Sequence, residues 1–270
     1  MNRPRPACSW YRECVTSESS WSAQRNNADV SWELFDPVAY VDHNYRAVQG
    51  EDAEMLRVVG DHFAGHFSGH SKGPVTGIDV GSGSNLYPAL TMLPWCEEIT
   101  LLERSPANVR YLKGQVTAYD ANWDVFWDVL CENQAYRCLD LDPREKAGRV
   151  VRVQQGDLFS LGQHQEKWSL GTMFFVAEAM TTSYGEFAFG VERFLRALAP
   201  GAPFAAAFME HSCGYQVGEH FFPACDVGES EVRASIEGFA GDFKVERITS
   251  SAEIRAGYSG MILAYGRRRN

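Results

Sequence analysis

The sequence predicts an α/β fold in which a mostly parallel sheet of seven strands is covered by helices and preceded by a helical cap. Three observations predict it. From residue 75 onward, short apolar segments alternate with amphipathic ones, which is the pattern of parallel strands joined by helices. A glycine turn, at residues 81–83, directly follows the first of these strands. The residues before that strand show mainly helical spacing of apolar side chains.

Three segments are expected along the chain. Residues 1–30 are polar, with several Ser, Asn and Arg residues and two prolines, so a flexible N-terminal arm is expected there. Residues 31–74 are expected to form a helical cap over the site. Residues 75–270 are expected to form the core, with an insertion at about 118–148.

The expected cap contains two helical signals. Asp36 followed by Pro37 is typical of a helix start, because the carboxylate caps free N–H groups and proline fits the first turn. Further on, apolar side chains recur every four residues, so they share one helix face. They are Met55, Val59, Phe63 and Phe67.

The core is expected to alternate strands and helices. The predicted strands are 75–80, 98–103, 149–154, 171–177, 203–209, 243–249 and 259–265. The predicted helices are 86–93, 106–117, 185–198 and 229–240. This order places the polar residues that follow each strand at one edge of the sheet, where α/β folds bind ligands.

The insertion interrupts this alternation. Its apolar residues Trp123, Phe126, Trp127, Leu130 and Cys131 have the spacing of an amphipathic helix. A charged loop is expected after it, from Asp140 to Arg149. The helix could pack on the core or serve as a lid over the site, and the sequence leaves both open.

Composition limits the class of protein. The chain has 270 residues and a net charge of −10, which disfavours nucleic acid as a partner because phosphates require a basic face. Its seven cysteines form no C-x-x-C pair, so neither a metal site nor a disulfide framework is expected, and thiols in a reducing cytoplasm are the simplest account. No segment is apolar for long enough to span a membrane. We therefore expect a cytoplasmic protein with a small-molecule partner, either a monomer or a homodimer.

The glycine turn indicates a nucleotide site. An apolar strand ends at Asp79, Gly81 and Gly83 follow, and the next strand ends at Glu103, which together form a nucleotide-binding βαβ unit. The third glycine of a dinucleotide site is replaced by Leu86, and an acid two residues before the turn is unfavourable beside a phosphate. S-adenosylmethionine has no phosphate and carries an ammonium and a sulfonium, which an acid favours. The pattern therefore favours S-adenosylmethionine over a nicotinamide cofactor.

Two further acids fit the same ligand. Glu103 can accept hydrogen bonds from both ribose hydroxyls. Asp157 follows the third strand and can accept from the adenine amino group, although a simple turn-forming role is the alternative.

These residues resemble the small-molecule N-methyltransferase family that includes the nicotinamide, phenylethanolamine and indolethylamine N-methyltransferases. The resemblance covers roughly residues 35–265 and implies a class I S-adenosylmethionine methyltransferase fold, which is Rossmann-like. It also implies site residues in five motifs, four that bind the cofactor and one on the substrate side. In this sequence they are Tyr40 and Tyr45 after Phe35-Asp36-Pro37, Asp79 with Gly81-Ser82-Gly83 and Tyr87, Glu103 with Asn108, Asp157 with Leu158, and, on the substrate side, Tyr215 before Gly218-Glu219.

The resemblance is weaker on the substrate side. Glu178 matches an acidic position that faces the amine in some members, and Ser212 falls where a substrate-contacting serine stands. Glu210 and His211 end the fifth strand and have no clear counterpart in the family. We expect Glu178, Glu210, Ser212 and Tyr215 to contact the substrate, and Glu178 or His211 to orient the amine or accept its proton.

The resulting prediction is methyl transfer from S-adenosylmethionine to a small molecule, at an amine nitrogen. Three alternatives remain open from the sequence. They are a C- or O-methyltransferase of a small aromatic or amino-acid-derived metabolite, a nicotinamide-dependent oxidoreductase, and a non-catalytic S-adenosylmethionine-binding protein.

Overall fold

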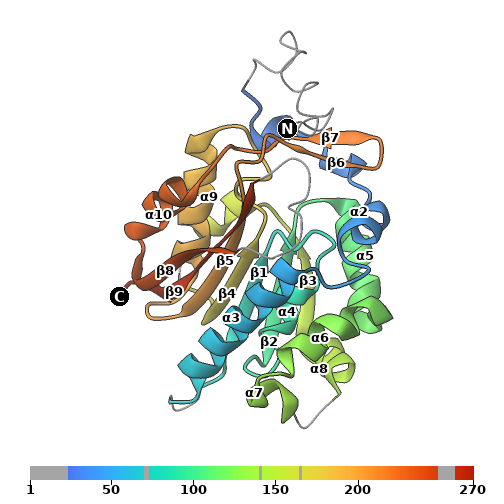
Figure 1. Ribbon diagram of the computed structural model, residues 1–270, viewed down its shortest axis with the longest axis vertical. Coiled ribbons are helices and arrows are strands. Elements are labelled where there is room, and N and C mark those ends of the chain that lie inside the picture. The colour runs from blue at the N-terminus through green and yellow to red at the C-terminus, as the bar shows by residue number, and fades with distance from the viewer. Residues whose placement is uncertain (1–23, 70–72, 140–141, 164–165, 249–258) are drawn as a thin grey trace, which may run out of the picture.

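A seven-stranded sheet organises the chain in a computed structural model that describes residues 24–69, 73–139, 142–163, 166–248 and 259–270 (Figure 1). The strand order is β3-β2-β1-β4-β5-β9-β8. Strands β1 to β5 run parallel, whereas β9 is antiparallel to both β5 and β8. The sheet strands are β1 Thr76–Val80, β2 Glu98–Glu103, β3 Val151–Gln155, β4 Leu170–Phe174, β5 Pro203–Glu210, β8 Ala240–Ile248 and β9 Gly260–Arg268. The predicted fold class is confirmed, and the ends of the seven predicted strands shift by at most three residues.

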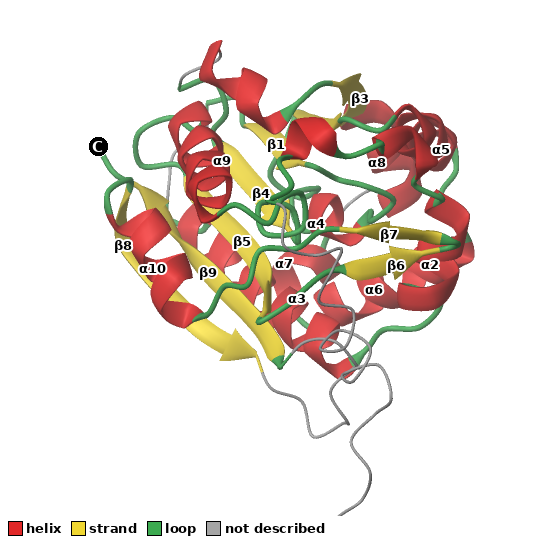
Figure 2. Ribbon diagram, turned by 90° about the horizontal axis from the view of Figure 1, so that it is seen from above, coloured by secondary structure: helices red, strands yellow, loops and turns green. Residues whose placement is uncertain are grey.

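Each face of the sheet carries its own apolar core. Along β5, Ala205 and Ala207 belong to one core, and Phe204 and Phe208 to the other, as the two-residue period of a strand requires. Helices α3, α4 and α6 pack on the first face and α9 and α10 on the second (Figure 2). The helices are α2 Pro37–Asn44, α3 Gly50–Phe67, α4 Tyr87–Leu90, α5 Pro106–Thr117, α6 Asp124–Leu130, α7 Gln134–Arg137, α8 Pro143–Val150, α9 Tyr184–Ala197 and α10 Glu229–Glu237.

The two helices before the sheet begin and pack as their sequence predicts. Asp36 caps α2, its Oδ1 accepting from the N–H groups of Val38 and Ala39 at 3.0 Å each. The predicted apolar face of α3 is buried. However, α3 lies along the sheet and contacts β5, β8 and β9, so it is a layer of the core. Among the described residues of the segment expected to cap the site, those that line the cavity described below lie between Trp32 and Tyr45.

The insertion is a packing element in its described part. Helix α6 turns Phe126 and Leu130 into the core beside α3, and no described residue of 118–148 lines the cavity. The expectation of a charged loop up to Arg149 is wrong, because residues 143–150 form α8. Asp142 and Pro143 start this helix by the same acid–proline signal that starts α2.

A two-stranded hairpin, β6 Tyr215–Val217 and β7 His220–Phe222, stands apart from the main sheet. It was not predicted, because strands of three residues carry little periodic signal. Gly218 provides the left-handed backbone of its turn, with φ 57°. Phe222 packs against Trp32 and Phe35, so the hairpin and the N-terminal segment cover the same end of the sheet.

Most of the expected N-terminal arm, up to Ala23, lies outside the described residues. From Gln24 the chain is described, with short 3-10 helices at Asn27–Asp29 and Trp32–Leu34. In the described ranges, no helix combines the length and the apolar character needed to cross a bilayer. The five cysteines within them form no disulfide.

Candidate active site

A cavity opens at the carboxyl ends of β1 to β4, beside the point where the strand order reverses between β1 and β4. Open α/β sheets bind ligands at this position. Counting the open space at its mouth, the cavity encloses about 730 Å³. Many of the predicted residues meet here. Those that line the cavity are Tyr40, Tyr45, Gly81, Ser82, Gly83, Glu103, Asn108, Asp157, Leu158 and Tyr215.

The glycine turn after β1 has a shape that requires glycine. Gly81 and Gly83 have φ 65° and 59°, in the left-handed region that side chains disfavour. A Cβ at Gly81 would lie 2.4 Å from Cγ1 of Val176. The Gly81 N–H donates to the Leu102 carbonyl at 2.7 Å, which fixes the turn to the end of β2. A ligand can therefore approach the backbone of this turn closely.

Glu103 joins the turn to the second strand. Its Oε2 accepts from the Gly83 N–H at 2.8 Å, and its Oε1 accepts from the Ser105 N–H at 2.6 Å. Burial raises the pKa of Glu103, and these hydrogen bonds partly oppose that rise. The Asn108 side-chain amide also donates to Oε1, at 3.4 Å. Because each carboxylate oxygen has about two acceptor positions, Oε2 retains one for a further donor.

The cavity wall contains buried polar atoms that have no partner among the described residues. They are Oγ of Ser84, Nδ2 of Asn85 and Oδ1 of Asn108. Buried polar groups normally hydrogen-bond to protein, water or ligand. The Asn85 amide suits a carboxylate, and Asn108 Oδ1 beside Glu103 suits ribose hydroxyls. This donor and acceptor set fits S-adenosylmethionine.

Asp157 has the turn-forming role that the sequence offered as an alternative. Its Oδ1 accepts from the Phe159 N–H at 2.8 Å, so it caps the 3-10 helix Leu158–Gln163. Its Oδ2 pairs with Arg104 at 2.8 Å and accepts from Asn27 at 3.3 Å. Asp157 lines the cavity as well, so capping and ligand contact are compatible.

Aromatic rings cover the mouth of the cavity. The Phe35 and Tyr40 rings lie 5.1 Å apart, and Tyr40 stands edge-on to Tyr45 at 5.7 Å. On the hairpin side, Tyr215 stacks on Phe222 at 5.5 Å. Aromatic faces attract cations, so this wall suits a ligand that carries a sulfonium or an ammonium.

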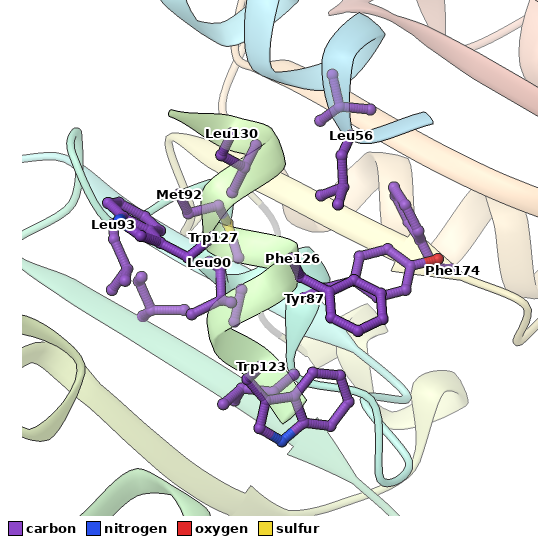
Figure 3. Close-up of a cluster of buried hydrophobic side chains, with 14 of the residues drawn as sticks. Leu56, Tyr87, Leu90, Met92, Leu93, Trp123, Phe126, Trp127, Leu130 and Phe174 are labelled. Atoms are coloured by element: carbon purple, nitrogen blue, oxygen red, sulfur yellow. The ribbon is translucent and has the colours of Figure 1, made fainter. Parts of the chain in front are cut away.

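Two residues predicted to bind the cofactor lie behind the wall. Tyr87 is fully buried, stacks on Phe126 at 5.1 Å and meets Phe174 edge-on (Figure 3). Asp79 is also buried, and Oδ1 accepts from the Thr172 hydroxyl at 2.7 Å. Burial raises the pKa of Asp79 to about 7, although hydrogen bonds from Ser82 and Thr172 oppose this. Neither side chain lines the cavity.

Glu178 is fully buried beside the cavity, between the lining residues Val176 and Ala179 in the chain. Its Oε1 accepts from the Met209 N–H at 3.0 Å, and its Oε2 is buried with no described partner. Burial raises the pKa of Glu178 to about 8. A carboxyl group with this pKa can hold or release a proton near neutral pH.

The other three residues expected on the substrate side have partners outside the cavity. Glu210 pairs with Arg247 at 2.7 Å and accepts from the Ser259 hydroxyl. His211 is exposed, and its Nδ1 lies 2.8 Å from Asp226. Ser212 accepts from the Gly214 N–H at 3.4 Å. None of the three lines the cavity, so their contact with a substrate stays a prediction.

Several lining residues were not predicted. Phe174 ends β4 and Phe175 follows it, and both line the cavity. Phe175 has φ 59°, an unusual backbone for an aromatic residue that often marks a functional site. Asn27 comes from the segment expected to be a flexible arm, and Trp32 from the start of the segment expected to be the cap. The sequence shows where a hydrophobic strand ends. It does not show that Asn27, in a polar segment 130 residues before Asp157, contacts that residue.

Comparison with known proteins identifies the chain. A model of the NNMT/PNMT/TEMT family matches residues 25–267. The chain belongs to this family. It is therefore an S-adenosylmethionine-dependent methyltransferase that acts on small molecules, as the sequence predicted. No curated protein sequence matches the chain.

Solved structures share the fold at low sequence identity. The N-methyltransferase NodS from Bradyrhizobium japonicum WM9, solved with S-adenosyl-L-homocysteine, is 9% identical with a TM-score of 0.53, covering 88% of this chain and 94% of NodS. The CurJ carbon methyltransferase is 11% identical with a TM-score of 0.55, covering 90% of this chain and 62% of CurJ. These similarities support the Rossmann-like fold of this methyltransferase.

Proposed function

We propose that this methyltransferase transfers the methyl group to an amine nitrogen of a small molecule bound under the aromatic wall. The observation that carries the proposal is Glu178, a fully buried carboxyl group whose Oε2 has no partner among the described residues. Glu178 does not itself line the cavity, but its near neighbours in the chain, Val176 and Ala179, do. An ammonium must lose a proton before or during attack, and a nearby carboxylate can attract the cation and accept that proton. Family membership supports a small-molecule acceptor.

Different residues would bind the cofactor and the amine acceptor. Glu103, Asn108, Asn85 and the glycine turn would hold the cofactor, and Asp157 would accept from its adenine amino group. S-adenosylmethionine, when bound, supplies an electrophilic methyl group on a sulfonium. Because the leaving group is already good, the protein contributes chiefly alignment of the amine and exclusion of water.

On the acceptor side, Tyr40, Tyr45 and Tyr215 would enclose the amine and keep water from it. Glu178 would attract the ammonium form when ionised and take its proton, directly or through water. His211 is exposed and engaged with Asp226, which favours Glu178 over His211 for this role. The rings of Phe174 and Phe175 favour a flat acceptor.

We also propose that the cap over this site consists of residues 27–45 together with the β6–β7 hairpin. Both lie over the carboxyl ends of the strands in Figure 1, and Trp32 stacks on Phe222 at 5.5 Å across the junction. The net charge of −10 and the free cysteines favour a cytoplasmic enzyme with no nucleic-acid partner.

The proposed cofactor site is tested by titration calorimetry with S-adenosylhomocysteine. Glu103→Ala should weaken binding by about 1–3 kcal/mol, since it removes charge-assisted hydrogen bonds and the acceptor of the Gly83 N–H. Glu98→Ala is the matched control, because Glu98 is an exposed glutamate at the other end of the same strand. Absence of binding to the folded wild-type protein at millimolar ligand would refute the cofactor site.

The proposed transfer to an amine nitrogen is tested by mass spectrometry of the products formed from amines, phenols, indoles and amino acids. We expect the rate of amine methylation to fall at least tenfold in Glu178→Gln, while binding of S-adenosylhomocysteine is retained. Methylation of carbon or oxygen alone would contradict the assignment of nitrogen as the acceptor, but it would not contradict the proposed cofactor site.

A further inference from the structure

We propose that Asn27 is a positioning residue that orients Asp157 for recognition of the adenine base. This inference rests on the proposed function, in which Asp157 accepts from the adenine amino group. It would make residues 24–35, here called the N-terminal strap, a working part of the cofactor site.

Asn27 is held in one orientation. Its side chain is buried, and its backbone N–H donates to Oε2 of Glu186 at 2.7 Å. The indole N–H of Trp32 donates to Asn27 Oδ1 at 2.9 Å. An indole nitrogen only donates, so the Asn27 oxygen must face Trp32 and its NH₂ must face Asp157. The Nδ2–Oδ2 distance to Asp157 is 3.3 Å.

The strap is anchored at both ends to the body of the protein. At one end, Arg25 forms a pair of backbone contacts with Thr182. Its N–H donates to the Thr182 hydroxyl and its carbonyl accepts from the Thr182 N–H, each at 2.9 Å. At the other end, the Trp32 ring stacks on Phe222 with an angle of 21° between the planes. Asn27 lies between these two anchored ends, so its side chain is held in a fixed position beside Asp157.

The hydrogen bonds of Asp157 leave one acceptor position. Oδ2 accepts from both Arg104 and Asn27, which fills its two lone pairs. Oδ1 accepts from the Phe159 N–H, which leaves one lone pair on the oxygen. Arg104, Asn27 and Asp157 all line the cavity. Asn27 thus helps to fix the plane of the carboxylate, and with it the direction of the remaining acceptor.

The test compares two ligands that differ at one group. S-adenosylhomocysteine carries an amino group on the base, whereas S-inosylhomocysteine carries a carbonyl oxygen there, which an acceptor repels. In the wild type we expect at least tenfold tighter binding of the adenine ligand, the size expected for one hydrogen bond to a charged group. In Asn27→Asp this preference should fall several-fold, because the donor to Asp157 becomes an acceptor while Trp32 keeps its partner.

The control is Asn26→Asp, which adds the same charge one residue earlier, where the side-chain oxygen accepts from exposed Gln24 and does not line the cavity. It should keep the wild-type preference. Asn27→Leu is the second variant, since it removes the donor without adding charge, and it should lower the preference in the same direction. Folding of every variant is checked by thermal melting.

The outcomes separate the two proposals. Lower preference in both Asn27 variants supports the positioning role. Equal weakening of both ligands, or no change, would show a structural role only and overturn it. A wild type that binds S-adenosylhomocysteine without preferring adenine would overturn the roles of Asp157 and Asn27 while leaving the methyltransferase assignment in place. A wild type that binds neither ligand would overturn the cofactor site itself.

Discussion

The hydroxyl of Tyr87 donates to Oδ1 of Asp52 at 3.2 Å, so this fully buried tyrosine is tied to α3, and it does not line the cavity. Asp52 is buried in the first turn of α3, and the Tyr87 ring lies between Phe126 and Tyr45. The resemblance to the N-methyltransferases implied that Tyr87 reaches the carboxylate of the cofactor. In this chain the geometry favours an indirect role, in which Tyr87 supports Tyr45, a residue of the cavity wall.

Tyr87→Phe should therefore affect stability more than binding. We expect a loss of about 1–2 kcal/mol in the free energy of unfolding, because a buried acceptor on Asp52 loses its donor. The dissociation constant for S-adenosylhomocysteine should change less than about threefold, since no cavity contact is removed. Urea unfolding and calorimetry measure the two quantities. Tyr136→Phe is the matched control, because that buried hydroxyl donates to the Thr91 carbonyl at 2.7 Å away from the cavity. A tenfold loss of affinity in Tyr87→Phe alone would establish direct contact with the cofactor.

Two glycine-to-alanine changes should have opposite effects. Gly81→Ala forces a side chain into a backbone with φ 65° and against Val176, so it should destabilise the turn by roughly 1–3 kcal/mol and weaken cofactor binding. Gly65→Ala lies inside α3 with no atom within 4 Å of the new Cβ, so it should stabilise the protein by about 0.5–1 kcal/mol. Thermal unfolding with and without S-adenosylhomocysteine measures both. Equal effects from the two changes would contradict the assigned geometry of the turn.

The fold could be predicted from the sequence because its signals are local. Strand periodicity, the acid–proline start of α2 and the residues after β1 and β2 each depend on neighbours in the chain. The same acid–proline signal at Asp142 was available and would have predicted α8. Asn27 carried no such signal, because its importance arises from a contact with Asp157 that only the folded chain creates.

The substrate side was harder to predict for the same reason. Glu178, Glu210 and His211 all come directly after predicted strands, so their place in the chain does not distinguish them, and only the family resemblance favours Glu178. The structure distinguishes them by their partners. Arg247 engages Glu210, Asp226 engages His211, and Glu178 is buried beside the cavity. The ion pairs of Glu210 and His211 involve residues that are distant in the sequence, so the sequence could not reveal that these two side chains are engaged elsewhere.

His211 should titrate without affecting methyl transfer. The hydrogen bond to Asp226 raises the pKa of His211, so Asp226→Asn should lower that pKa toward its ordinary value. Proton NMR of the imidazole across pH 5–9 measures the shift, and initial rates over the same range test its relevance. The pH profile of the rate should be the same in Asp226→Asn and in the wild type, since neither side chain lines the cavity. A rate profile that moves with the imidazole pKa would instead make His211 the base.

Glu178 should make the protein less stable as the pH rises. Burial raises its pKa from 4.5 to about 8, so between these values the folded state binds a proton that the unfolded state has released. The stabilising contribution of this bound proton is complete below pH 4.5 and is lost as the pH rises to 8, by at most about 5 kcal/mol.

Glu178→Gln removes this titration and should flatten that part of the pH dependence of the free energy of unfolding. Urea unfolding of the variant and the wild type at pH 5, 7 and 9 measures the difference, which should grow in favour of the variant as the pH rises. Glu237→Gln, at an exposed glutamate that ends α10, is the control and should follow the wild type. A constant difference at all three pH values would mean that Glu178 ionises normally. It would then already be charged at pH 5, and the rate of methyl transfer would show no ionisation of this group near pH 8.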